Sequence, residues 1–236
     1  MIVRMRGSRP PAWHNGGVSV FQSIRDMFTV REGAHANALN VPERIEAPAG
    51  FARISLRPVR EDDQEDWNDV RWGNRDWLMP WESGNPLGGR PLSFNEWVRR
   101  MRDDEAAGTG VVFLIEYQMQ IVGQVSLGAI SYGAMRTGMV GYWVSHRYAG
   151  RGFAPLAVAM LADWAFRDPD GPRLHRIEIA ILPENHRSKR VVAKLGLTDE
   201  GLRRSYMYVN GAWRDHESYS LLADDCPGSV TDRLRA

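Results

Sequence analysis

The sequence predicts an α+β fold with a mixed, mostly antiparallel sheet of about seven strands and helices on both faces. Three apolar, β-rich segments, residues 111–117, 120–127 and 139–145, follow one another with short links, which is typical of an antiparallel meander. A helical pattern over 153–166 precedes the next strand. Asn210-Gly211 separates the last two strands, and this dipeptide is a strong hairpin signal.

The chain before the meander predicts one strand and the start of a helix. Ile54 and Leu56 alternate with polar residues, and Pro58 then ends the run. This pattern indicates a short strand with one buried face. The acidic residues 61–63 suit a helix start because they lie at the positive end of the helix dipole.

A second helix before the meander is predicted from Ser93 to about Asp104. Ser93 with Glu96 three residues later matches a capping box. The preceding stretch, 74–91, is rich in Trp, Gly and Pro, which indicates a loop or a broken helix. The remaining predicted elements are a strand over 176–182, a helix over 188–195 ended by Gly196, and strands over 203–209 and 213–222.

Length and composition indicate one main domain. The chain has 236 residues, of which 43% are hydrophobic, which is enough for one sizeable core. We expect one globular domain over residues 49–223, a flexible leader or N-terminal extension over 1–48, and an irregular tail over 224–236. The single cysteine, Cys226, cannot form an internal disulfide, which favours a reduced, cytoplasmic location.

Charge and patterning argue against several classes of partner. The formal net charge of +1 gives no broad field that would attract nucleic acid. No run approaches the roughly 18 apolar residues of a spanning helix, so no membrane partner is expected. The six histidines lack the spacing of a metal site, so no metal is expected.

A candidate phosphate-binding site follows the strand Gly141–Val144. A helix start offers unpaired N–H groups and partial positive charge, and glycines let the backbone approach an anion. Taken alone, this loop is equally consistent with an ordinary turn, and it is neither a dinucleotide fingerprint nor a P-loop. The residues that would contact the phosphates are Arg147, Tyr148, Ala149, Gly150, Arg151, Gly152, Phe153 and Ala154.

Several motifs occur together in a recognisable order. They are Gly141-Tyr142-Trp143-Val144, the glycine loop after it, Asn185-x-x-Ser188, Lys194-Leu195-Gly196-Leu197, Glu200-Gly201 and Trp213-Arg214-Asp215-His216. Over about residues 51–222 the chain thus resembles the GNAT acyltransferases, in the RimJ/RimL-like branch of ribosomal-protein N-terminal acetyltransferases. The resemblance implies the GNAT fold with splayed central strands, and acetyl-CoA as the donor.

The resemblance also implies a mechanism, which is direct attack of an amine on acetyl-CoA in a ternary complex. A backbone N–H of Trp143 or Val144 would stabilise the thioester oxygen as it gains charge. Ser188, or Asn185 through a water, would protonate the departing CoA sulfur. The alternative is that Asn185 and Ser188 only cap the following helix.

The general base is left open between Glu82, Glu178, Glu116 and Asp215. Glu178 alternates with Ile177 and Ile179, so it faces either a cleft or solvent. Glu82 follows Trp81 in the Trp-rich loop, where Trp77 and Trp81 are candidates for an acceptor wall or for simple packing. No single carboxylate stands out.

The acceptor that we expect is the N-terminal α-amine of a protein, in the first place a ribosomal one. An α-amine has an ordinary pKa of about 7.7–8.0, against about 10.4 for lysine, so it needs little help to lose its proton. The alternatives are a small amine, such as an antibiotic or a polyamine, and a non-catalytic CoA-binding sensor or assembly module. Monomer and homodimer are both compatible with the sequence.

Overall fold

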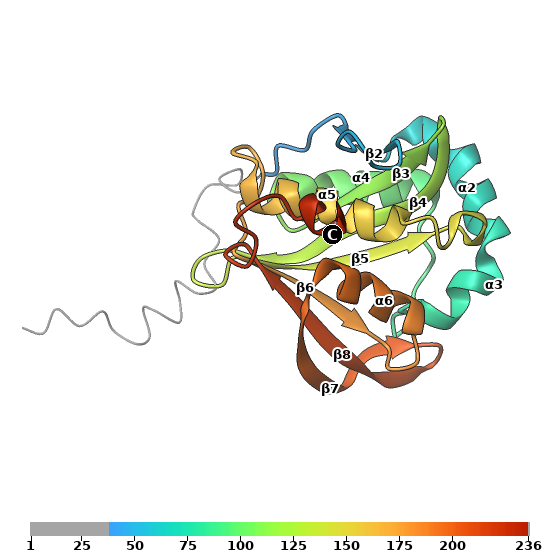
Figure 1. The fold of residues 1–236 in the computed structure, drawn as a ribbon. Coiled ribbons are helices and arrows are strands. Elements are labelled where there is room, and N and C mark those ends of the chain that lie inside the picture. The colour runs from blue at the N-terminus through green and yellow to red at the C-terminus, as the bar shows by residue number, and fades with distance from the viewer. Residues whose placement is uncertain (1–37, 236) are drawn as a thin grey trace, which may run out of the picture.

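The structure, a computed structural model, describes residues 38–235 (Figure 1). Within that range, eight strands form one sheet in the order β1-β2-β3-β4-β5-β6-β8-β7. The strands are β1 (Ile45–Glu46), β2 (Ile54–Pro58), β3 (Val111–Tyr117), β4 (Gln120–Ser131), β5 (Thr137–Val144), β6 (Arg176–Ile181), β7 (Thr198–Val209) and β8 (Ala212–Leu222). Only β5 and β6 pair in parallel, so the predicted mixed, mostly antiparallel sheet is confirmed.

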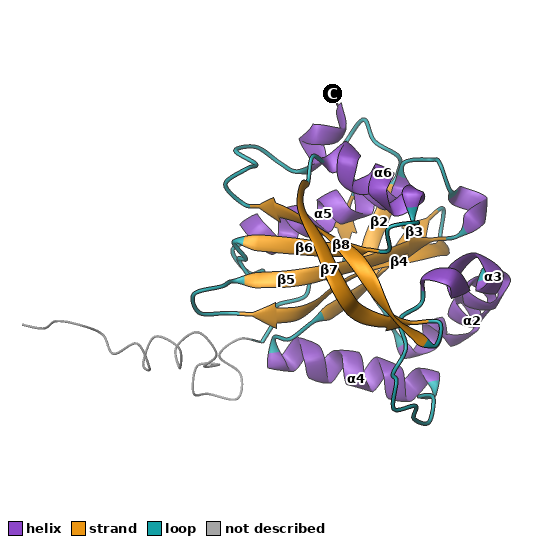
Figure 2. Ribbon diagram, turned by 90° about the horizontal axis from the view of Figure 1, so that it is seen from below, coloured by secondary structure: helices purple, strands orange, loops and turns teal. Residues whose placement is uncertain are grey.

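Helices cover both faces of the sheet, as predicted. They are α2 (Gln64–Gly73), α3 (Arg75–Leu78), α4 (Phe94–Ala107), α5 (Phe153–Arg167) and α6 (His186–Leu195). Strand alternation sends Phe113 and Ile115 of β3 into the main core with α5, and Leu114 into a smaller core with Trp67 of α2 and Val98 of α4. We call these two sides the α5 face and the α4 face; Figure 2 shows α4 and α5 on opposite sides of the sheet.

Local sequence explains where α4 begins and ends. The Ser93 hydroxyl accepts from the Glu96 N–H at 3.4 Å, and the Glu96 carboxylate accepts from the Ser93 N–H at 2.8 Å. This reciprocal pair is the predicted capping box. The helix ends at Gly108, whose φ of 73° is the left-handed conformation that glycine adopts without strain.

Both ends of the described chain pack against the sheet. Strand β1, inside the segment that we expected as a leader, pairs with β2, and Leu39 and Val41 pack against the main core. The tail forms a short 3-10 helix, Thr231–Arg235, beneath which Val230 is fully buried. The rest of the expected leader, residues 1–37, lies outside the described residues.

Several predicted elements have different bounds in the structure, including β4, which continues to Ser131, and β5, which begins at Thr137. Strand β7 begins at Thr198 rather than at residue 203, because register shifts near Gly201 and Ser205 let the chain stay paired with β8. Helix α6 begins at His186 rather than at residue 188. The Trp-rich stretch contains α3 and a 3-10 helix, Met79–Trp81.

The two central strands diverge. β5 and β6 pair only at Thr137↔Arg176, Gly138↔Ile177 and Met139↔Glu178. Beyond these positions β5 continues to Val144 and β6 to Ile181 without pairing to each other (Figure 1). This confirms the splay that the family resemblance implied, and it leaves one backbone edge of β5 without a neighbouring strand.

The Trp-rich segment is fastened to the β7–β8 hairpin. Ser83 forms a β-bridge with Val209, and the Gly84 N–H donates to the Tyr208 carbonyl oxygen at 2.9 Å. The Asn210 side-chain amide donates to the Pro80 carbonyl oxygen at 3.1 Å. We call these three contacts the clasp.

None of the helices that the structure describes combines the length and the apolar character needed to cross a bilayer.

Candidate active site

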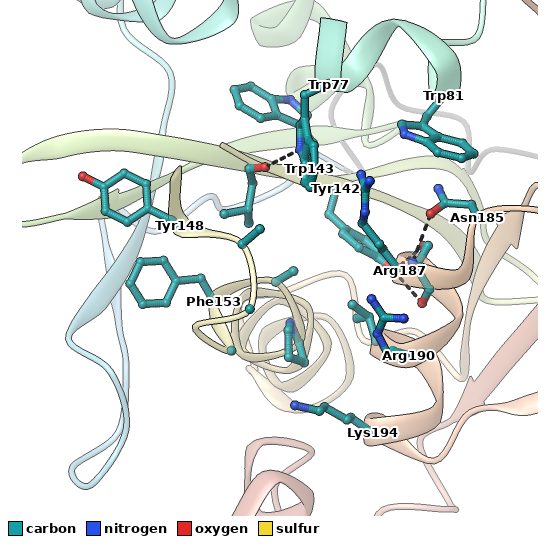
Figure 3. A pocket seen from close by; sticks show the side chains of 18 of the residues that line it. Trp77, Trp81, Tyr142, Trp143, Tyr148, Phe153, Asn185, Arg187, Arg190 and Lys194 are labelled. Carbon is teal, nitrogen blue, oxygen red and sulfur yellow. Dashed lines mark hydrogen bonds between the residues drawn. The ribbon is translucent and has the colours of Figure 1, made fainter. Parts of the chain in front are cut away.

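A cavity of about 620 Å³ opens at the splay, between the start of α5, the start of α6 and the α3 region (Figure 3). It brings together most of the residues that the sequence singled out: Trp143, Val144, Tyr148, Ala149, Gly150, Gly152, Phe153, Ala154, Asn185 and Ser188. Arg147, Arg151, Glu178 and Glu82 are not among its lining residues. The cavity is also lined by Tyr142, Arg187, Arg190 and Lys194, for which no role was expected from the sequence.

The glycine loop has the geometry that an anion cradle needs. Gly150 and Gly152 have φ values of +81° and +80°, and nothing lies within 4 Å of where their Cβ atoms would stand. The first helical bond of α5 runs from the Leu156 N–H to the Gly152 carbonyl oxygen. The N–H groups of Phe153 and Ala154 therefore have no partner in the helix and remain available to an anion.

An aromatic cluster supports the loop from beneath. Tyr148 stacks on Phe153 with ring centroids 5.8 Å apart, and Tyr117 contacts both rings. The guanidinium groups of Arg147 and Arg151 lie 5.9 Å and 5.2 Å from the centroid of the Tyr148 ring. These two arginines therefore add positive charge beside the loop without lining the cavity.

Strand β5 presents its free edge to the cavity. The Ser145 N–H donates to the Val122 carbonyl oxygen of β4 at 2.8 Å. Because alternate residues of an antiparallel strand hydrogen-bond to the same neighbour, the N–H and C=O of Val144 point away from β4, toward the splay. The Trp77 indole confirms this direction by donating to the Val144 carbonyl oxygen at 3.1 Å. Of the two expected amide donors, Val144 rather than Trp143 faces the cavity.

A pair of hydroxyl groups lies at the start of α6. The Asn185 side chain caps the helix by accepting from the Ser188 N–H at 3.1 Å, which leaves the Ser188 hydroxyl free for another role. The Tyr142 hydroxyl lies 2.6 Å from that of Ser188. Burial raises the pKa of Tyr142 well above its ordinary value, despite an opposing hydrogen bond to Ser188, so the phenol stays protonated.

The four candidate carboxylates are all held by other groups. Glu82 pairs with Arg71, and the Asp215 carboxylate accepts from the Ser205 N–H at 2.7 Å. Glu116 is buried between two arginines on β2 and the segment before it. Among the described residues, no aspartate or glutamate lines the cavity.

Glu178 lies on the α4 face of the sheet, bound by two arginines. Its carboxylate accepts from Arg176 at 2.8 Å and from Arg203 at 2.7 Å. Burial alone would raise the pKa of Glu178, but these hydrogen bonds outweigh it and hold the pKa below its ordinary value. A carboxylate held in this way is a weak proton acceptor.

We therefore expect Glu178→Gln to change stability more than turnover. A depressed folded-state pKa contributes stability that is present above the ordinary glutamate pKa, about 4.3, and is lost as the pH falls through the lower folded value. The variant should unfold at lower urea than the wild type at pH 7, and the two should converge in acid. Urea titrations at pH 7 and pH 3.5 measure this; a gap that does not narrow in acid contradicts it.

Helix α6 adds a row of positive charge that faces the cavity. Arg187, Arg190 and Lys194 recur at helical spacing, so they share one side of the helix. Arg187 lies over the Trp77 ring, 3.8 Å from its centroid, whereas Lys194 reaches toward α5 (Figure 3). The spacing of these three residues was visible in the sequence and could have identified them.

Fold and cavity together combine a splayed strand pair with a glycine loop and helix start that are suited to an anion. Residues 53–198 match the family model described as an acetyltransferase (GNAT) domain. The chain belongs to the GNAT acetyltransferase family, and the protein is an N-acetyltransferase. Groups of three or more candidate metal ligands do not occur in the part of the chain that the structure describes.

The chain is similar to several named N-acetyltransferases, one of which is a ribosomal-protein acetyltransferase. It is 30% identical over 177 residues to the probable N-acetyltransferase YjcK of Bacillus subtilis, covering 73% of this chain and 95% of that one. It is 25% identical to the [ribosomal protein uS5]-alanine N-acetyltransferase of Escherichia coli, covering 73% and 89%. The structure of Mycobacterium smegmatis RimJ in complex with CoA-disulfide matches with a TM-score of 0.72 and 34% identity, covering 81% and 91%.

Proposed function

We propose that the protein transfers the acetyl group of acetyl-CoA to the N-terminal α-amine of a protein, by direct attack in a ternary complex. The observation that carries the proposal is the continuous cavity, which joins the glycine cradle to the free edge of β5. The relatives named for ribosomal-protein alanine acetylation and for RimJ support the same acceptor class. A ribosomal protein is thus the first acceptor to examine.

The residues present fit a CoA thioester. The Phe153 and Ala154 amides and the two left-handed glycines would hold the pyrophosphate, and the free edge of β5 would pair with the pantetheine amides. Bound acetyl-CoA supplies the activated acetyl group. The Val144 N–H would then donate to the thioester oxygen as it gains negative charge.

The charge around the cavity favours an α-amine over a polyamine. Arg187, Arg190 and Lys194 line the cavity, and no carboxylate of residues 38–235 does, so a polycation would meet repulsion there. An α-amine brings only one positive charge and loses it close to neutral pH. The indole rings of Trp77 and Trp81 provide flat walls near Arg187 for the first residues of a peptide (Figure 3).

Thiol release with a panel of acceptors tests the proposal. The panel contains short peptides that begin with Ala, Ser, Gly or Met, the same peptides with a blocked α-amine, spermidine and an aminoglycoside. We expect release with free-amine peptides, a preference among first residues, and little release with the blocked peptides. A rate that is highest with spermidine or the aminoglycoside, or that is unaffected by blocking the α-amine, would contradict it.

Ser188→Ala is expected to lower kcat by less than about 10²-fold, below the usual range for loss of a proton donor. The reason is that a thiol has an ordinary pKa near 8.5, so CoA thiolate leaves with only modest help. Steady-state thiol release measures the effect. A variant that retains the full kcat removes Ser188 from the proton-donor role.

Asn185→Ala is the matched control, because the Asn185 side chain is the helix cap. Loss of a cap costs about 1 kcal/mol of stability. Asn185→Ala should therefore lower the melting temperature, whereas Ser188→Ala should leave it near the wild-type value. This pair separates capping from catalysis.

A further inference from the structure

The Tyr142 side chain joins β5 to the start of α6 across the splay. Tyr142 lies two residues before Val144, so both side chains lie on the α5 face, where Val144 belongs to the main core and Tyr142 packs against it. Beyond Met139, β5 has no paired strand on the side of β6, and the phenol reaches from β5 toward the first turn of α6 (Figure 3). Its partner there is Ser188, and both residues line the cavity.

The two hydroxyl groups share one hydrogen bond, and the geometry favours the phenol as its donor. The oxygens of Tyr142 and Ser188 are 2.6 Å apart. If the Ser188 hydroxyl donated instead, the phenol proton would have only the Ser188 carbonyl oxygen within reach, at 3.4 Å. That separation exceeds the usual range of an O–H···O hydrogen bond, which ends at about 3.0 Å. A phenol is also more acidic than an aliphatic alcohol and is therefore the better donor.

This direction leaves the proton of the Ser188 hydroxyl without a protein acceptor. The Asn185 side chain holds the backbone N–H of Ser188, and the phenol of Tyr142 takes one lone pair of the Ser188 Oγ. Across residues 38–235, the Ser188 hydroxyl has no hydrogen-bond partner other than Tyr142. Its proton is therefore free to point into the cavity, and a hydroxyl that already accepts one hydrogen bond is a stronger donor of the next.

The phenol is a constant donor because it does not ionise near neutral pH. Burial raises the pKa of Tyr142 well above its ordinary value, and the hydrogen bond with Ser188 opposes this effect only in part. The direction of the hydrogen bond between the two hydroxyl groups therefore stays the same over the pH range in which an α-amine loses its proton, about 7.7–8.0.

We propose that Tyr142 is a positioning residue, whose phenol binds the Ser188 oxygen and turns the Ser188 hydroxyl proton toward the CoA sulfur. This inference rests on the proposed N-acetyltransferase reaction, in which Ser188 is the proton donor to that sulfur. The amine nitrogen bonds to the acetyl carbon, the C–S bond breaks, and its electron pair moves to the sulfur. Ser188 gives its proton to the sulfur, and a proton lost by the amine nitrogen returns to the Ser188 oxygen through solvent. Tyr142 keeps its own proton throughout.

Tyr142→Phe tests the contact, because it removes the phenol oxygen and keeps the ring. We expect it to lower kcat several-fold, and by no more than Ser188→Ala does, because Tyr142 acts through Ser188. When the two substitutions are combined, kcat should match that of Ser188→Ala alone within about twofold, since the effects of residues that share one interaction are not additive. Thiol release is measured with whichever acceptor of the panel the wild type uses best.

Tyr132→Phe is the matched control for the loss of a buried phenol oxygen. Tyr132 lies between β4 and β5, away from the cavity lining, and its hydroxyl has no hydrogen-bond partner within residues 38–235. Its kcat should equal that of the wild type. The inference is overturned by a wild-type kcat in Tyr142→Phe, by an equal loss in Tyr132→Phe, or by a double variant whose loss is the product of the two single losses.

The thiol pKa of bound CoA provides a measurement that a purely structural role of Tyr142 would not change. A hydroxyl that donates to the sulfur favours the thiolate and so lowers this pKa. Titration of the ultraviolet absorbance of the thiolate, on protein saturated with CoA, should give a higher pKa in Tyr142→Phe and in Ser188→Ala than in the wild type. The three cations of α6 that line the cavity are the same in every variant, and the buried Cys226 adds the same background to each.

This titration needs no acceptor amine, so it separates the inference from the proposed function. If no amine of the panel is acetylated, the proposed function fails, whereas a raised thiol pKa in both variants still supports the role of Tyr142 in directing the Ser188 hydroxyl. A thiol pKa that is the same in the wild type and in Tyr142→Phe overturns the inference, even where the wild type acetylates peptides.

Discussion

Replacing Arg57 by methionine is expected to lower the free energy of unfolding by about 3–5 kcal/mol. The Arg57 guanidinium lies in the interior and binds Glu116 at 2.6 Å and the two oxygens of Asp63 at 2.6 and 2.7 Å. Both carboxylates are themselves buried. Methionine fills similar space but leaves two negative charges without their shared partner.

The same network joins β2 and β3 to the turn before α2. Helix α3, which lines part of the cavity, follows α2 directly in the chain. Asp63 also accepts from the Arg60 N–H at 2.7 Å, which fixes that turn. Burial alone would raise the pKa of Glu116, but hydrogen bonds from Arg57 and Arg44 outweigh it and keep the pKa below its ordinary value. The variant removes Arg57 from this pair and leaves Arg44 as the remaining cation beside the Glu116 carboxylate.

Arg90→Met is the matched control for this measurement. Arg90 pairs with Glu96 at 2.5 Å, but its side chain is 72% exposed, and exposed pairs contribute at most about 1 kcal/mol. Urea titrations of the two variants at pH 7 should differ by several kcal/mol. Equal losses would show that burial of the Arg57 network has no energetic consequence.

Gly152→Val is expected to weaken acetyl-CoA binding by at least about tenfold, which corresponds to 1.4 kcal/mol. A β-branched residue at φ +80° is strained by roughly 1–2 kcal/mol. Its side chain would also occupy the space above the Phe153 amide, where a phosphate must approach to reach the helix start. Calorimetric titration with acetyl-CoA gives Kd directly.

Gly211→Val separates strain from lost contact. Gly211 has a φ of +82°, and no atom lies within 4 Å of its Cβ position, so it matches Gly152 in backbone strain. It lies in the β7–β8 turn, away from the phosphate loop. We expect lower thermal stability but an unchanged Kd. Equal weakening by both variants would mean that strain alone, and not the cradle, accounts for the effect.

The sequence predicted those features that depend on neighbouring residues. The Ser93–Glu96 capping box, the Asn210-Gly211 turn and the glycine loop each lie within a few positions of chain, and the structure contains all three. Alternation within β6 also predicted correctly that Glu178 and Ile177 lie on opposite faces of the sheet, although it left open what Glu178 contacts.

Long-range partners were beyond reach because no local pattern encodes them. Glu178 is bound by Arg203, 25 positions later, and the Trp77 indole meets the Val144 carbonyl across 67 positions. The shifted start of β7 has the same origin, since its bulges are set by the register with β8. For this reason the glycine loop and the start of α5, which form one local motif, were predictable, whereas the contacts that place α3 beside β5 and the β7–β8 hairpin were not.

The clasp builds the cavity wall at Trp81 from two distant stretches of chain, and this matters for engineering. Residues 80–84 and 208–210 are held together by a β-bridge, a main-chain hydrogen bond and a side-chain hydrogen bond, although more than a hundred positions separate them. If either stretch alone were replaced by that of a relative, the main-chain donors and acceptors that join the two stretches could lose their partners. A graft intended to change acceptor preference therefore has to move both stretches as one cassette, while the phosphate loop can remain in place.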